Sequence, residues 1–162
     1  MSAYGGLNAA KRKDVRRVVQ GFKINYIKSN MTEYEKVLTA FRFLQKNCGY
    51  TQNVSKYTHA YDAWGALVQG KAQCSGYALG MKALCDAIGI KCYHVCANSK
   101  ASNPSHQWNM VRVNKKWYIL DAQVGYFLVG SNMFRSLGWE WNKKGLPTCS
   151  KLNHPKARSY AP

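Results

Sequence analysis

Acidic residues are scarce in this chain of 162 residues: 7 Asp and Glu stand against 24 Lys and Arg, a formal net charge of +17. The densest positive cluster is Lys11, Arg12, Lys13, Arg16 and Arg17. A field of that sign attracts anionic partners. No zinc-finger spacing or aromatic RNA-reading motif is present, so nucleic acid is not the expected partner. An anionic cell-envelope polymer is a candidate partner, and a basic surface that only keeps the protein soluble is the competing interpretation.

Long apolar runs are also missing, and we expect no membrane span because no run approaches the length that one needs. The first residues, Met-Ser-Ala-Tyr-Gly-Gly, lack the apolar core of a signal peptide. The chain is therefore expected to be cytosolic, or a mature or excised piece of a longer secreted protein. An extracellular or cell-envelope location is favoured over the cytoplasm.

The remaining composition predicts one folded domain, since hydrophobic residues make up 46% of the chain and aromatic residues 13%. Residues 1–29 are interpreted as a basic lead-in that contains a helix and belongs to the same domain, with residues 1–12 flexible. Residues 30–162 form the main part of this domain.

Helical patterns dominate the first half of the chain. The segment Thr32-Glu-Tyr-Glu35 is a capping-box pattern, and Gly49 stands where a C-terminal glycine belongs. A second apolar stripe begins at Cys74 and ends at Gly89. The expected helices span residues 14–28, 32–48, 61–68 and 74–88.

Strand patterns follow, at residues 90–97, 106–113, 116–121 and 127–129, whereas residues 139–162 look irregular. Asn114-Lys115 forms a two-residue turn between the second and third strands. Helices first and consecutive antiparallel strands afterwards predict an α+β fold.

The hairpin brings a histidine and an aspartate together. If Asn114-Lys115 is a two-residue turn, Val113 pairs with Lys116, and Asp121 lies opposite Trp108, on the same face as His106. His106 and Asp121 are then diagonal neighbours whose side chains can meet. The carboxylate would hold the imidazole and leave its other nitrogen for a thiol.

Cys74 is the candidate thiol. It opens the predicted helix, and a helix N-terminus favours negative charge and therefore the thiolate. Unpaired backbone N–H groups at that end can stabilise an oxyanion, and Gly76 allows close backbone approach. A thiol, an imidazole and a carboxylate make a nucleophile, its base and the group that orients the base.

Other residues carry weaker signals. Trp64, Gln73 and Trp108 are predicted to line the substrate cleft, although a large aromatic residue near a core is more often core alone. Cys92, His94 and Cys96 alternate on one strand face, but we favour core packing around His94 over a zinc site. We expect no metal and no cofactor.

The six cysteines are expected to be mostly reduced and buried, although an even number can indicate disulfides. A domain of this size does not need disulfides. If Cys74 is a free thiol, five cysteines remain, an odd number that cannot all pair.

Four segments together resemble the transglutaminase-like core of the papain-like cysteine-enzyme superfamily: Gln73-Cys-Ser-Gly-Tyr-Ala-Leu-Gly80, Leu84-Cys-Asp-Ala-Ile-Gly-Ile90, His106-Gln-Trp-Asn109 and Lys116-Trp-Tyr-Ile-Leu-Asp121. The lead-in Thr32-Glu-Tyr-Glu-Lys-Val37 is similar to that of bacterial members. The resemblance covers roughly residues 30–125, and it makes residues 30–162 the catalytic domain.

The resemblance implies a Cys-bearing helix packed on an antiparallel sheet that carries the other two residues. It implies Cys74 as the nucleophile, His106 as the base and Asp121 as the orienting group. Many members continue past the aspartate with a polar residue and a tryptophan, where this chain has Ala122-Gln123.

The function expected is attack on peptide or protein amides through a thioester, followed by hydrolysis or amine transfer. The family includes crosslinkers, deamidases, proteases and inactive relatives. An inactive module that binds an anionic polymer or peptide is therefore the alternative, and a nucleic-acid binder using the basic N-terminus is a third.

Overall fold

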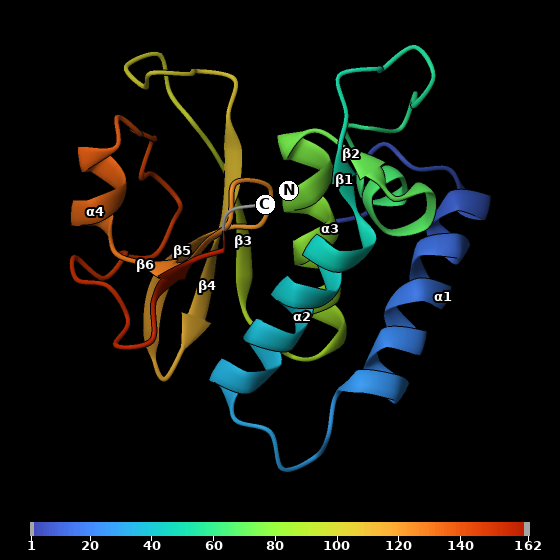
Figure 1. The fold of residues 1–162 in the computed structure, drawn as a ribbon, viewed down its shortest axis with the longest axis horizontal. Helices are drawn as coiled ribbons and strands as arrows, with labels where there is room; N and C mark the ends of the chain where they lie inside the picture. The colour runs from blue at the N-terminus through green and yellow to red at the C-terminus, as the bar shows by residue number, and fades with distance from the viewer. Residues whose placement is uncertain (1, 161–162) are drawn as a thin grey trace.

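The computed structural model describes residues 2–160 and consists of a helical layer beside a five-stranded antiparallel sheet (Figure 1). The expected α+β fold is confirmed. The helices are α1 (Ala9–Tyr26), α2 (Glu33–Asn47), α3 (Cys74–Ala87) and α4 (Ser131–Ser136), with a π-helical turn η1 (Gly65–Gln69). The strands are β1 (Gly49–Tyr50), β2 (Lys71–Ala72), β3 (Cys92–Cys96), β4 (Gln107–Val113), β5 (Lys116–Asp121), β6 (Tyr126–Val129) and β7 (Arg158–Ser159).

Helix α1 begins earlier than the sequence pattern predicts. Asn8 caps it, with the side chain accepting from Lys11 N at 2.9 Å. The expected flexible lead-in is therefore wrong for residues 2–12, since Ala3 and Leu7 are also buried in the main core; residue 1 lies outside the described residues. The lead-in packs into the same core as the rest of the chain.

Helix α2 begins at the capping box that the sequence predicts. Thr32 accepts from Glu35 N at 3.1 Å, and the Glu35 carboxylate accepts from Thr32 N at 3.2 Å. The prediction for Gly49 is wrong: it is not left-handed, and the chain passes through an extended Cys48 directly into β1. Parallel pairing of β1 with β2 accounts for this exit.

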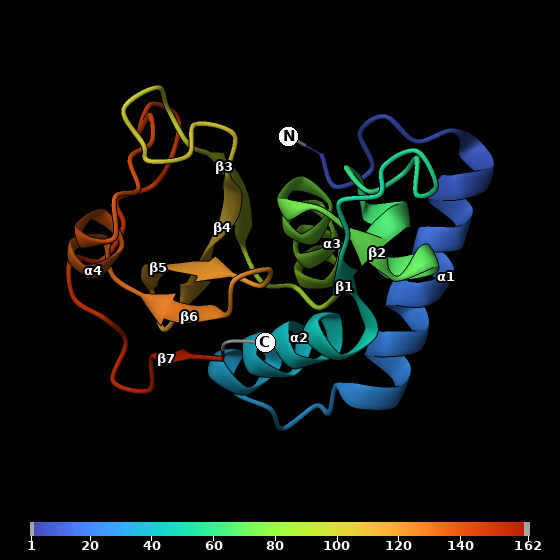
Figure 2. The same ribbon diagram turned by 45° about the horizontal axis from the view of Figure 1, so that its top comes forward.

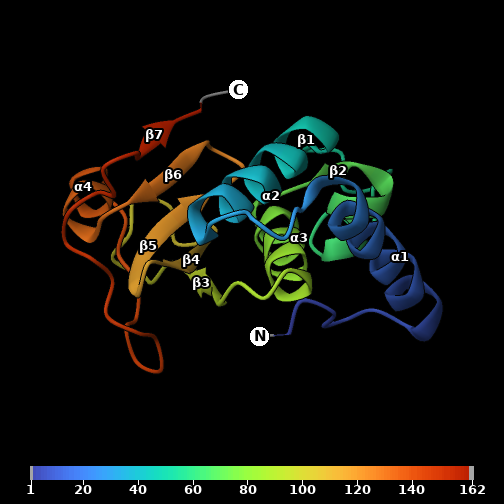
Figure 3. The same ribbon diagram turned by 90° about the horizontal axis from the view of Figure 1, so that it is seen from below.

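The sheet has the order β3-β4-β5-β6-β7, which Figure 2 shows from a second angle. Val113 pairs with Lys116, so the predicted hairpin register is confirmed. Asn114 and Lys115 have φ of 52° and 68°, as a tight two-residue turn requires. Strand β7 closes the edge beyond β6, as the view from below shows (Figure 3).

The sheet is buried on both faces. Val111, Val113 and Leu120 face the helical layer and belong to the main core. Trp108 and Met110 project to the opposite face, where Phe134 of α4 and Trp141 complete a second core; the residues of that core are Val95, Trp108, Met110, Ile119, Val129, Phe134 and Trp141. Residues after β6 therefore contribute packing that the sequence pattern did not indicate.

A buried amide joins the two layers. Asn109 Nδ2 donates to Ala78 O of α3 at 2.9 Å and to Tyr93 O of β3 at 3.2 Å. Asn109 is 1% exposed, so these hydrogen bonds form away from competing water. They fix α3 against the sheet.

Candidate active site

Cys74 is the first residue of α3, and its side chain is half-buried. The Sγ atom lies 3.7 Å from Ser105 O, in the loop that precedes β4. No side chain caps the helix at Gln73, whose Nε2 instead donates to Thr51 O at 3.1 Å. The thiol therefore occupies a helix N-terminus where partial positive charge is available.

Gly76 allows α3 to approach the preceding loop closely. A methyl group at this position would lie 2.4 Å from Ala60 O and 2.7 Å from Ala72 Cβ. Any side chain there would push the start of α3, and with it Cys74, out of place.

His106 and Asp121 are in direct contact, His106 Nε2 lying 2.5 Å from Asp121 Oδ2. The second carboxylate oxygen, Asp121 Oδ1, accepts from Val124 N at 3.1 Å. His106 is 4% exposed and Asp121 is 1% exposed. A carboxylate held at both oxygens fixes the imidazole ring and leaves Nδ1 available.

The imidazole is favoured in its charged form. Burial lowers the pKa of His106, but hydrogen bonds to Asp121 and Cys74 and the negative charge of both groups outweigh it and raise the pKa to about 9.

Cys74 and His106 line one cavity of about 550 Å³. Gln73, Tyr50, Tyr61 and Gln123 also line it, together with Trp139. A cavity of this size suits a peptide segment or an extended side chain. Gln73 therefore lines the same cavity as Cys74, and its contact with a substrate stays a prediction.

Trp139 is a feature of the site that the sequence patterns do not single out. Its ring lies 4.5 Å from the His106 ring, centroid to centroid, at an interplanar angle of 33°. It comes from the segment after α4 that carries no periodicity, so only its aromatic character could have drawn attention to it.

The other two tryptophans predicted for the cleft lie elsewhere. Trp108 is 1% exposed and packs edge-on against Phe134, because α4 covers that face of the sheet. The indole of Trp64 donates to Asp14 Oδ2 at 3.0 Å, and Lys11 Nζ lies 4.1 Å from its ring centroid. Trp64 therefore packs against α1.

The cysteine predictions hold only in part. All six cysteines lie in the described residues as free thiols, and Cys48, Cys85 and Cys92 are buried. Cys96 is exposed, so the expected packing of two core cysteines around His94 is wrong; His94 Nε2 instead contacts Gln107 Oε1 at 2.6 Å. Within residues 2–160, no group of three or more His, Cys, Asp or Glu side chains is arranged to hold a metal ion.

Comparison with known proteins identifies the family. The model of the transglutaminase-like superfamily matches residues 20–122, which include Cys74, His106 and Asp121. The chain belongs to the transglutaminase-like superfamily. A search of curated proteins finds no match.

Two solved structures share the transglutaminase-like fold with this chain. One is a TGase and the other is the "putative cysteine protease from Cytophaga hutchinsonii"; each has a TM-score of 0.52 and 16% identity over 73% of this chain. The chain spans 34% of the first and 43% of the second. Trp139 lies beyond the residues that the family model matches.

Proposed function

We propose that this transglutaminase-like protein attacks amide bonds of peptides or proteins through a thioester on Cys74. His106 acts as the acid and base, and Asp121 orients its imidazole. The observation that carries the proposal is the contact of His106 with Asp121, where His106 shares one cavity with a thiol at a helix N-terminus. The names of the structural neighbours, a TGase and a cysteine protease, agree with this chemistry.

The reaction divides into two steps. The Cys74 thiolate attacks the amide carbonyl, and the His106 imidazolium gives its proton to the departing nitrogen as the C–N bond breaks. Water or a primary amine then attacks the thioester, loses a proton to His106 and releases the thiolate. Backbone N–H groups at the start of α3 supply donors for the oxyanion.

The thioester can be detected directly. A glutamine-containing peptide and a fluorescent primary amine are incubated with the protein, and mass spectrometry follows the mass of Cys74 and of the products. Release of ammonia without incorporation of the fluorescent amine indicates hydrolysis of the glutamine side-chain amide. Cleavage of the peptide indicates proteolysis, and incorporation of the fluorescent amine indicates amine transfer. We expect Cys74→Ala to abolish the adduct.

Cys96→Ala is the matched control, since Cys96 is an exposed thiol that does not line the cavity. It should retain the activity of the parent. Loss of activity in both variants, or in neither, contradicts the role proposed for Cys74.

The cavity also permits binding without turnover, and thiol alkylation separates the two functions. A Cys74 that reacts with iodoacetamide well below the pH at which Cys96 does so supports the enzyme. Equal reactivity of the two thiols supports a binding module.

An anionic cell-envelope polymer is a proposed partner of α1. Lys13, Arg16 and Arg17 are exposed on this helix, and Arg12 is exposed beside them. Binding to such a polymer should weaken steeply as salt is added, because exposed charges are screened. None of the helices in residues 2–160 combines the length and apolar character that crossing a bilayer requires.

A further inference from the structure

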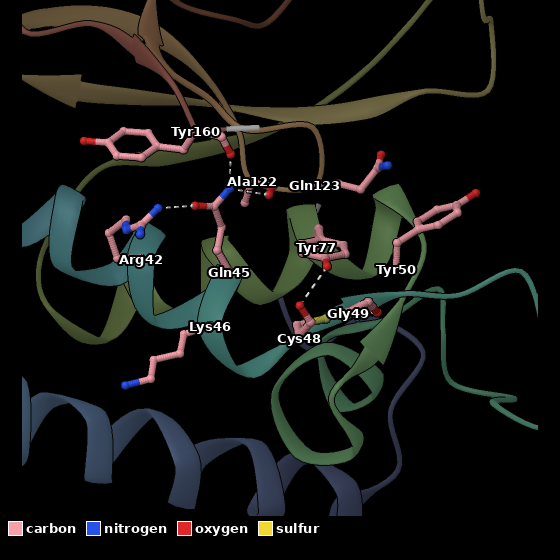
Figure 4. A pocket seen from close by; sticks show the side chains of 10 residues that line it. All are labelled: Arg42, Gln45, Lys46, Cys48, Gly49, Tyr50, Tyr77, Ala122, Gln123 and Tyr160. Carbon is pink, nitrogen blue, oxygen red and sulfur yellow. Dashed lines mark hydrogen bonds between the residues drawn. The ribbon is translucent and has the colours of Figure 1, made fainter. Parts of the chain in front are cut away.

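A second pocket of about 480 Å³ adjoins the candidate active site. Tyr50 and Gln123 line both cavities, so the two cavities lie side by side, and we refer to them together as the groove. The second pocket lies between α2 and the turn that follows β5, and Figure 4 shows Tyr50 and Gln123 at one end of it and Arg42 at the other.

Two cationic side chains line this second pocket. Arg42 and Lys46 line it, and both are exposed on α2. Among the described residues, no Asp or Glu lines either cavity.

Hydrogen bonds hold the groove in place. Gln45 Nε2 donates to Ala122 O at 3.3 Å and to Tyr160 O at 3.2 Å, and Arg42 Nη1 donates to Gln45 Oε1 at 3.1 Å (Figure 4). The Arg42 guanidinium also lies 4.7 Å from the ring centroid of Tyr160. Arg42 is therefore positioned before any ligand arrives, which lowers the entropy that binding must overcome.

We infer that this pocket is a subsite for carboxylate side chains of the peptide whose amide reacts at Cys74. The inference rests on the proposed function and extends it to a substrate class, acidic peptides. A peptide lying in the groove passes Tyr50 and Gln123 and brings a Glu or Asp a few residues from the reactive amide up to Arg42. A planar guanidinium pairs with a carboxylate through two parallel hydrogen bonds. Lys46, whose side chain extends away from Gln45 in Figure 4, adds charge at the rim.

Binding is measured without catalysis. Fluorescent peptides with one central Gln and with Glu or Gln at flanking positions are titrated into the full chain carrying Cys74→Ala, and fluorescence anisotropy gives Kd. We expect the Glu peptides to bind more tightly and to lose that advantage as salt rises. Arg42→Gln with Lys46→Gln should weaken Glu-peptide binding about threefold to tenfold, the effect of losing two exposed charge contacts.

A matched control removes the same charge elsewhere. Lys115→Gln with Lys116→Gln alters the exposed turn at the far end of β4 and β5. If this pair reduces affinity as much as Arg42→Gln with Lys46→Gln, net charge and not the subsite attracts the peptide, and the inference fails.

Charge reversal gives a second measurement. Arg42→Glu with Lys46→Glu should exchange the preference from Glu peptides to Lys peptides, and an unchanged preference contradicts the subsite. A preference for Glu peptides with no thioester in the parent protein would keep the subsite and refute the proposed chemistry. A thioester in the parent protein, with no preference for Glu peptides, would support the proposed chemistry and refute the subsite.

Discussion

The ring of Trp139 lies 4.5 Å from the ring of His106, centroid to centroid, and both residues line the candidate active-site cavity. Asp121 holds the edge of the His106 ring. The imidazole is thus fixed by a hydrogen bond in its plane and by an aromatic ring across its face.

Trp139→Ala should lower activity more than it lowers stability. Loss of the indole lets the imidazole tilt, and displacement of a reacting group by about 1 Å can reduce turnover about 100-fold. The aromatic pair itself contributes only about 1 kcal/mol. Trp139→Phe, which retains an aromatic ring, should recover most of kcat. The measurements are kcat, KM and thermal unfolding, and an unaltered kcat in Trp139→Ala contradicts a positioning role.

The free energy of unfolding should fall as pH rises from 6.5 to about 9. Burial alone lowers the pKa of His106, but hydrogen bonds to Asp121 and Cys74 raise it to about 9 in the folded protein, against 6.5 as its ordinary value. The charged imidazole then stabilises the fold fully below pH 6.5, and this contribution disappears as pH passes about 9. Its upper limit is roughly 3 kcal/mol.

The contribution of the charged His106 imidazole is measured by urea unfolding of the parent and of His106→Gln, at a pH below 6.5 and at a pH above about 9. The difference in unfolding free energy between the two proteins should shrink as pH rises. Parallel pH curves would mean that the folded imidazole is uncharged.

Gly76→Ala should lower the stability of the fold and change the reactivity of the Cys74 thiol. The added methyl group would meet Ala60 O at 2.4 Å, and relieving such overlap in a packed site typically costs about 1–3 kcal/mol. Denaturant unfolding and the rate of Cys74 alkylation should both change. Gly21→Ala is the matched control, because nothing lies within 4 Å of a methyl group there, and it should stabilise α1 by about 0.5–1 kcal/mol.

Lys115→Gly should stabilise the protein by about 1 kcal/mol. Lys115 has φ of 68°, a left-handed conformation that glycine adopts without the penalty that a side chain carries. The Asn-Gly pair is the preferred sequence for this turn. Lys116→Gly, in strand β5, should destabilise instead, and thermal unfolding distinguishes the two changes.

Local signals in the sequence were sufficient for the elements that build the site. The turn Asn114-Lys115 fixes the hairpin register, and that register leads directly to the contact of His106 with Asp121. Thr32 and Glu35 likewise locate the start of α2 through hydrogen bonds between residues close in sequence.

The errors concern contacts between distant segments. Nothing near Trp108 in sequence indicates that Phe134 of α4 will cover its face of the sheet. Nothing near Trp64 indicates that its indole will bond to Asp14. The groove at Arg42 depends on Gln45 meeting Ala122 and Tyr160, which only the folded chain brings together.

The amide of Asn109 determines how the two halves of the site stay aligned. The sulfur belongs to α3 and the imidazole to the residue that directly precedes β4, and the Asn109 side chain ties Ala78 of α3 to Tyr93 of the neighbouring strand β3. Gentle warming that loosens this tie would separate the proposed nucleophile Cys74 from the proposed base His106 while every helix and strand persisted. Catalysis should therefore fade at a lower temperature than the circular dichroism signal does.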